Sequence, residues 1–149
     1  MSIAYATVPD GHVGDFYGAV AGLFPGSVKV YVGSVPDKPT YPYAVLWGSL
    51  GDETSEALAD VPDEIRIPFR VTYVGLTLAQ VAHVASKVRP ALNRAAPYVS
   101  NWITSRMRQS SIMDVQTDRD VTITGSGAHP LYAVDEFLLV ASKLRKEAQ

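Results

Sequence analysis

The chain has 149 residues, of which 47% are hydrophobic and 19% charged, with a net charge of −2 at pH 7. This length and composition predict one domain around one hydrophobic core, and the near-neutral charge gives no general attraction to nucleic acid or an anionic membrane. The chain contains no cysteine, which excludes disulfides and thiolate metal sites.

The first part of the chain predicts one helix followed by two strands. Asp10 is a suitable N-cap for a helix over about residues 12–24, because apolar residues recur there at helical spacing (Val13, Phe16, Tyr17, Val20 and Phe24). Pro25 and Gly26 should end it. Residues 28–32 and 43–47 are rich in β-formers and predict strands on either side of a proline-containing loop.

The clearest strand is predicted to begin at Ile65, after a long connection over residues 48–64. Ile65, Ile67, Phe69, Val71 and Tyr73 alternate with more polar residues, which predicts one buried face. Pro68 has no backbone N–H, so we expect this strand to lie at a sheet edge or to carry a bulge.

The strongest helix is predicted over about residues 77–94. Thr77 and Gln80 have the spacing of a capping box, and an apolar stripe follows (Val81, Val84, Ala85, Val88 and Leu92). Pro90 should kink this helix or end its regular part early.

The remaining elements are predicted mainly as strands. We expect a strand over 98–108, an uncertain segment over 112–124 that resembles a hairpin arm, a turn over 125–130 and a last strand over 131–141. The predicted fold is therefore α+β, a single domain over residues 1–149 with an antiparallel or mixed sheet flanked by two helices. Residues 1–9 and the charged tail 143–149 are expected to be flexible.

The sequence shows no convincing catalytic or cofactor-binding pattern. A nucleophile elbow, a phosphate-binding glycine loop and a helical zinc motif are all absent. His12, His83 and His129 are interpreted as ordinary surface or turn residues, and Asp114, Asp118 and Asp120 as a solvated turn that lacks a calcium-loop pattern. We therefore expect no enzyme activity, no cofactor and no metal. No stretch reaches the roughly 20 apolar residues of a membrane span, and the start lacks signal-peptide features.

Charge is distributed unevenly along the chain. Residues 48–64 contain six acidic residues and no basic one, whereas residues 65–113 contain seven basic residues and no acidic one. Solvated surfaces explain both runs, and this is the preferred interpretation. Alternatively, the two segments meet across copies of the chain and close a ring. Binding to nucleic-acid phosphates is a weaker alternative, because no recognition motif accompanies the basic residues.

The order of several motifs resembles the tail-terminator family of long-tailed double-stranded DNA bacteriophages. The motifs are Val30-Tyr-Val-Gly-Ser-Val-Pro36, Tyr43-Ala-Val-Leu-Trp47, Arg66-Ile-Pro-Phe-Arg-Val-Thr-Tyr-Val-Gly75, the segment from Thr77 to Arg89, and Tyr132-Ala-Val-Asp-Glu-Phe-Leu-Leu139. The resemblance covers roughly residues 13–141. Pro90 departs from the family pattern, and segment 98–128 matches no part of it.

The resemblance implies a structural virion protein at the head-proximal end of the tail, assembled in the host cytoplasm. Such a protein forms a six-fold ring on the tail-tube protein, stops tube polymerisation and provides the docking surface for the head connector or stopper protein. DNA passes through the ring without specific binding. The alternatives are another neck component, such as a head-closure or tail-completion protein, or a small intracellular enzyme.

Two sets of charged residues are candidate contact sites. Asp52, Glu53, Glu56 and Asp60 are predicted to face the DNA channel or a neighbouring ring. The second set is predicted to form the contact between subunits; it consists of Arg66, Arg70, Arg106 and Arg108.

Overall fold

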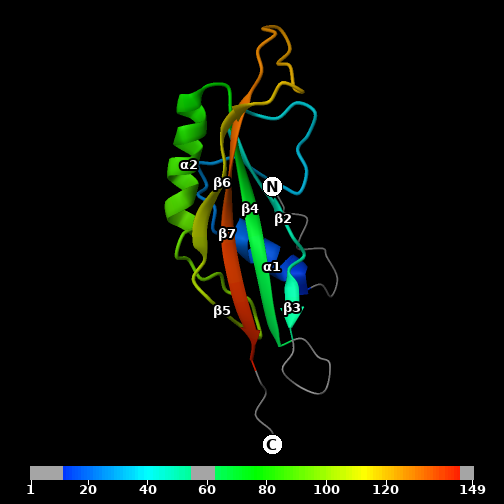
Figure 1. The fold of residues 1–149 in the computed structure, drawn as a ribbon, viewed down its shortest axis with the longest axis vertical. Coiled ribbons are helices and arrows are strands. Elements are labelled where there is room, and N and C mark those ends of the chain that lie inside the picture. The colour runs from blue at the N-terminus through cyan, green and yellow to red at the C-terminus, as the bar shows by residue number, and fades with distance from the viewer. Residues whose placement is uncertain (1–11, 55–62, 145–149) are drawn as a thin grey trace, which may run out of the picture.

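Two helices lie against one face of a mixed seven-stranded sheet in the computed structural model, which describes residues 12–54 and 63–144 (Figure 1). The elements in chain order are α1 (His12–Ala21), β1 (Val30–Val32), β2 (Tyr43–Gly48), β3 (Asp52–Thr54), β4 (Glu64–Gly75), α2 (Leu78–Leu92), β5 (Trp102–Thr104), β6 (Arg108–Thr117) and β7 (Leu131–Lys143). This arrangement confirms the predicted α+β fold.

Strands β4 and β7 form the long central ladder of the sheet. They pair antiparallel from Glu64 opposite Ser142 to Gly75 opposite Leu131. On the outer side of β4, β2 pairs with its second half and β3 with its beginning. On the outer side of β7, β6 pairs with its first half and β5 with its end. Strand β1 extends the sheet beyond β2 as its only parallel pair among the described strands.

The alternation that predicted β4 also determines which face of the sheet is buried. Ile65, Ile67, Phe69, Val71 and Tyr73 all have at most 1% of their surface exposed. They pack in one cluster with apolar residues of both helices and of β2 and β7. Burial of each large apolar side chain contributes about 1.5–3 kcal/mol, so this cluster is the main stabilising feature of the domain.

Helix α2 begins with the predicted cap and continues beyond the predicted break. The Thr77 hydroxyl accepts a hydrogen bond from the Gln80 N–H at 3.2 Å, and the Gln80 side chain accepts one from the Leu76 N–H at 2.8 Å. The helix runs through Pro90 to Leu92, so the expected early end is wrong. Val88 and Leu92 on either side of Pro90 are fully buried, and their packing outweighs the hydrogen bond that proline cannot make.

The predicted edge position of β4 is also wrong, because β4 lies in the interior of the sheet. Its pairing with β7 is continuous through Pro68, without a bulge. On the other side, β2 pairs from Phe69 onward and β3 only up to Arg66, so Pro68 lies at the interval between them. The missing N–H therefore interrupts no described ladder.

Part of the predicted acidic connection is strand β3. Gly51 precedes this strand with φ +89°, and a Cβ atom there would lie 2.8 Å from Ile67 Cγ1. Glycine thus allows the chain to approach β4 closely enough to pair. Glu56 and Asp60 lie outside the described residues.

Several element boundaries differ from the sequence predictions. Helix α1 ends at Ala21 instead of residue 24, and the strand expected over 98–108 is limited to β5. Strand β6 begins before the uncertain segment, at Arg108, and ends within it at Thr117, and the last strand extends into the predicted tail as far as Lys143. Asp10, residues 1–9 and residues 145–149 lie outside the described residues, so their predicted roles are not tested.

Candidate interaction surfaces

The face of the sheet opposite the helices carries a patch of aromatic and aliphatic side chains. Tyr43, Val45 and Val74 form its buried centre, and Tyr31, Tyr41 and Tyr132 pack around them. Adjacent to this cluster is an apolar hollow of about 400 Å³, bordered by β2, β4, β7 and the turn after β6. Burial, followed by the neighbouring Tyr41 and Tyr31, raises the pKa of Tyr43 to about 12.

Arg70 belongs to this aromatic hollow. It lies opposite Trp47 in the β2–β4 ladder, and its Cζ is 5.5 Å from the centre of the Trp47 ring. Trp47 Nε1 donates a hydrogen bond of 2.8 Å to Thr72 Oγ1, which fixes the indole against β4. The structure therefore places Arg70 apart from the groove that contains the other three predicted contact arginines.

Those three arginines line a second surface, which we call the basic groove. It has a volume of about 840 Å³ and is lined by Arg66, Asn93, Arg94, Ser105, Arg106, Met107, Arg108, Gln109, Leu138 and Val140. Arg66, Arg106 and Arg108 are exposed, as is Arg94, which the sequence interpretation did not single out. No acidic residue lines this groove within the described part of the chain.

The connection between β5 and β6 holds the groove in shape. The Arg94 N–H donates to the Met107 carbonyl at 2.8 Å, and the Met107 N–H donates to the Ala95 carbonyl at 2.9 Å. Met107 itself is fully buried in the core. This anchoring leaves Arg106 and Arg108, the two neighbours of Met107, on the exposed side.

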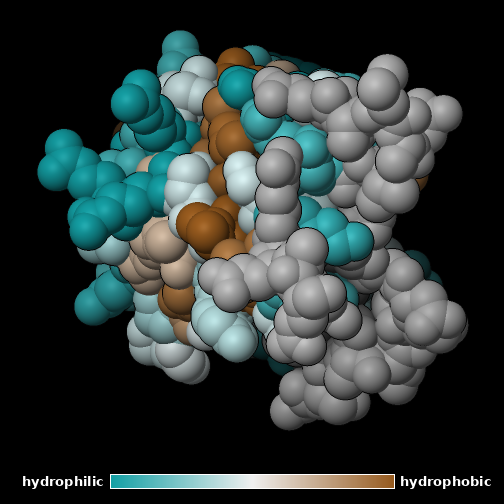
Figure 2. Space-filling model, turned by 90° about the horizontal axis from the view of Figure 1, so that it is seen from below, coloured by the Kyte–Doolittle hydropathy of each residue, from teal (hydrophilic) through white to brown (hydrophobic). Residues whose placement is uncertain are grey.

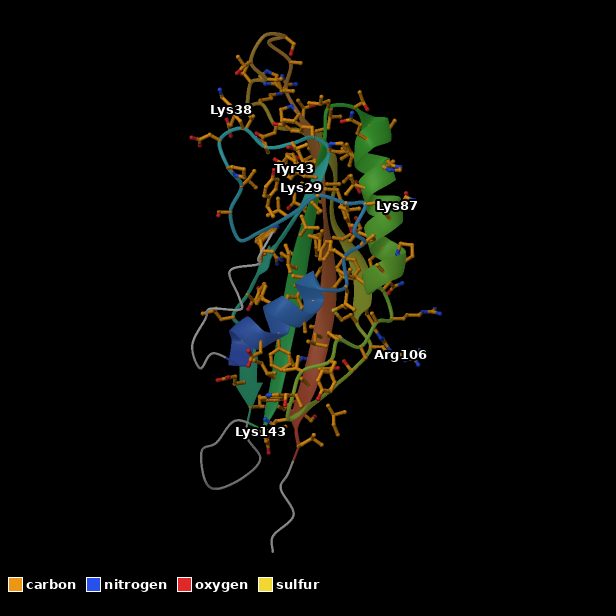
Figure 3. All side chains as sticks on the ribbon, turned by 180° about the vertical axis from the view of Figure 1, so that it is seen from behind. Lys29, Lys38, Tyr43, Lys87, Arg106 and Lys143 are labelled. Carbon is orange, nitrogen blue, oxygen red and sulfur yellow. The ribbon has the colours of Figure 1, made fainter. Side chains whose placement is uncertain are left out.

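The figures locate the basic groove relative to the helices. Arg106 lies on the same side of the molecule as α2, and β3 lies on the opposite side (Figures 1 and 3). Seen from the lower end, hydrophilic residues gather on the α2 side beside a narrow band of hydrophobic residues (Figure 2). On the part of this end that the described residues form, hydrophilic side chains therefore border a hydrophobic band.

The described members of the acidic set lie on edge strand β3. Asp52 and Glu53 are both exposed, with Asp52 opposite Arg66 and Glu53 opposite Ile65 in the β3–β4 ladder. Asp63 continues the acidic character, and its N–H donates to the Thr54 carbonyl at 3.1 Å. An acidic edge thus borders the sheet on the side away from β5 and β6.

A buried charged network connects α2 to the sheet, and the sequence interpretation did not identify it. Arg89 Nε and Nη2 donate to the two Asp135 carboxylate oxygens at 2.6 and 2.8 Å, and the Tyr73 hydroxyl donates to Asp135 Oδ2 at 2.7 Å. The Asp135 side chain is 2% exposed and that of Arg89 48%. The hydrogen bond to Asp135 raises the pKa of Arg89, and burial, followed by this carboxylate, raises the pKa of Tyr73. The feature of the sequence that could have indicated this network was a charged residue on the buried face of the predicted last strand.

The three histidines are distributed over separate elements. His12 is the first residue of α1, His83 is exposed on α2, and His129 Nδ1 lies 2.7 Å from the Val121 carbonyl oxygen. Among the described residues, no group of three or more histidine, aspartate or glutamate side chains is arranged to hold a metal ion. No helix in residues 12–54 or 63–144 is long and apolar enough to cross a membrane.

Comparison with known proteins finds a remote structural similarity and no similarity in sequence to a family model or a curated protein. A chain from the structure "Virion of native gene transfer agent (GTA) particle" has 17% sequence identity with this chain and a TM-score of 0.45. The alignment covers 93% of this chain and 99% of that chain.

Proposed function

We propose that this chain is a structural virion protein of a long-tailed phage, and specifically the tail terminator that caps the tail tube. The proposal rests on the order of the sequence motifs that resemble that family. The structure places these motifs on β1, β2, β4, α2 and β7. They therefore include the central ladder of the sheet and the helix that packs on it.

In this proposal the protein acts through its surfaces and without catalysis. A ring of copies sits on the last ring of tail-tube subunits and stops further addition, and its other side receives the head connector. The aromatic hollow, the basic groove and the acidic edge are three chemically distinct surfaces on one domain. A protein that contacts its own copies, a tube and a connector needs several such surfaces.

The test is electron microscopy of lysates from phage that lack this gene. Overlong, irregular tails without heads are expected, because tube growth would have no stop. Complementation with the wild-type gene should restore the normal tail length and serves as the control. Intact infectious particles from the deletion would refute a virion role.

Another neck component is the second candidate, since it would share the size and the several contact surfaces. The same micrographs separate the two. Tails of normal length beside separate, DNA-filled heads would assign the protein to the connector side of the neck.

A further inference from the structure

The basic groove concentrates positive charge, and no described acidic residue lines it. Arg94, Arg106 and Arg108 line it from the chain segments at the β5–β6 edge of the sheet, and Arg66 lines it from β4. None of the four forms an ion pair with another described residue. Glu136 lies two positions from Leu138 on β7 but does not line the groove. Like charges held together in a concave site favour an anionic partner.

The backbone conformation of Arg94 supports a functional role for the groove. Arg94 has φ +67°, a left-handed conformation that glycine or asparagine adopts at lower cost after a helix. An arginine in this conformation costs of order 1 kcal/mol, and such strain tends to occur at functional sites. The strained residue therefore adds a charge to the groove at a position that asparagine would fill at lower cost.

The acidic edge of the same molecule has the complementary chemistry. Asp52 and Glu53 are exposed on β3, and Asp63 adjoins this strand through its hydrogen bond to the Thr54 carbonyl. Arg66 lies opposite Asp52 of its own chain, so the argument depends on the three arginines at the other edge. Strand β3 and Arg106 lie toward opposite edges of the sheet (Figures 1 and 3), and Arg94 and Arg108 line the groove with Arg106.

We propose that the basic groove receives the acidic β3 edge of a second copy of this chain. Because β3 and the part of the groove formed by Arg94, Arg106 and Arg108 lie toward opposite edges of the sheet, the contact is head-to-tail. Repeated head-to-tail contacts produce a ring when the rotation closes. This proposal rests on the tail-terminator assignment, from which a closed ring is expected. It adds to that assignment the two surfaces that meet in the ring.

The absence of cysteine from the chain allows a direct cross-linking test. Thr54→Cys labels the acidic edge and Ser105→Cys labels the groove, and both substitutions leave every charge in place. The two proteins, carrying tags of different size, are mixed at high concentration under mild oxidation. The mixed Thr54–Ser105 cross-link should exceed that of a control pair, Thr54→Cys with Ser126→Cys in the exposed turn before β7, about tenfold.

Charge reversal then tests the electrostatic origin of the contact. Arg106→Glu with Arg108→Glu in the Ser105→Cys protein should lower the cross-link about tenfold, as should Asp52→Lys with Glu53→Lys in the Thr54→Cys protein. Mixing the two reversed proteins should restore the cross-link. Lys38→Glu with Arg119→Glu, an equal charge change at exposed positions outside the groove, should leave it unchanged.

A single chain that carries both cysteines distinguishes a head-to-tail contact from a two-fold dimer. The head-to-tail contact gives a ladder of oligomers larger than dimers. A yield no higher than the control pair, or a product that stops at dimers, would overturn the proposal. Binding of short duplex DNA that depends on Arg106 and Arg108, without the cross-link, would assign the groove to nucleic acid instead.

The outcome is separable from that of the gene deletion. Overlong tails without the Thr54–Ser105 cross-link would overturn this contact and leave the tail-terminator assignment standing. The cross-link together with tails of normal length would support this contact and overturn the tail-terminator assignment.

Discussion

Asp135 is the single described residue of the core that carries a charge, and its partners determine whether it is tolerated there. Removal of Arg89 would leave a buried carboxylate with only the Tyr73 hydroxyl. Arg89→Ala is therefore expected to lower the free energy of unfolding by about 2 kcal/mol, less than for a fully buried pair because Arg89 is half exposed. Urea unfolding measures the loss.

The matched control for this substitution is Lys87→Ala, which removes an exposed cation from the same helix. It should change the free energy of unfolding by less than about 0.5 kcal/mol. Equal effects of the two alanine substitutions would show that the ion pair contributes nothing beyond a surface charge. The Tyr73→Phe substitution should be milder than Arg89→Ala, because Arg89 would still neutralise the carboxylate.

Tyr43 makes the stability depend on pH in the alkaline range. Burial raises its pKa to about 12 in the folded chain, compared with about 10 when unfolded. A raised folded-state pKa gives stability that is complete below about pH 10 and is lost as the pH rises toward 12. Tyr43→Phe should reduce this loss, measured as thermal midpoints against pH; an unchanged alkaline slope would contradict the assignment.

At the scale of elements, the cap of α2 provides a local test. Thr77→Ala removes the acceptor for the Gln80 N–H and is expected to lower the free energy of unfolding by about 1 kcal/mol. Thr77→Ser keeps the hydroxyl and should lose much less. Amide hydrogen exchange should show faster opening of the first turn of α2 in the alanine variant alone. Equal exchange in both variants would mean that packing, and not the cap, holds this turn.

Local patterns predicted the elements well, because they depend on residues that are close in sequence. The alternation over β4 and the Thr77–Gln80 spacing were both confirmed. The position of β4 in the sheet was predicted wrongly from Pro68, because the outcome depends on where β2 ends and β3 begins. Such long-range pairing is not visible in the composition of one strand.

The candidate surfaces show the same limit. The sequence identified Arg66, Arg106 and Arg108 as a set, and the structure brings them into one groove. It also grouped Arg70 with them, although Arg70 lies against Trp47. Arg94 was not included, since only the three-dimensional path after α2 brings it beside the β5–β6 connection.

At the scale of the whole molecule, the basic groove and the aromatic hollow predict different responses of self-association to salt. The Debye length falls from about 10 Å at 0.1 M salt to about 3 Å at 1 M, so a contact between the groove and the acidic edge should weaken as salt is added. Association through the aromatic hollow would persist, because burial of apolar surface is not screened. Sedimentation velocity of the wild-type chain at low and high sodium chloride measures the response.

The expected result is a shift toward monomers at high salt. The Lys38→Glu, Arg119→Glu control should shift in the same way, since its groove is intact. The Arg106→Glu, Arg108→Glu variant should be monomeric at both salt concentrations, because two of the three arginines on which the contact depends have become acidic. Wild-type oligomers that persist at high salt would instead indicate association through the aromatic hollow. The Trp47→Ser substitution, on the rim of that hollow, should then dissociate them.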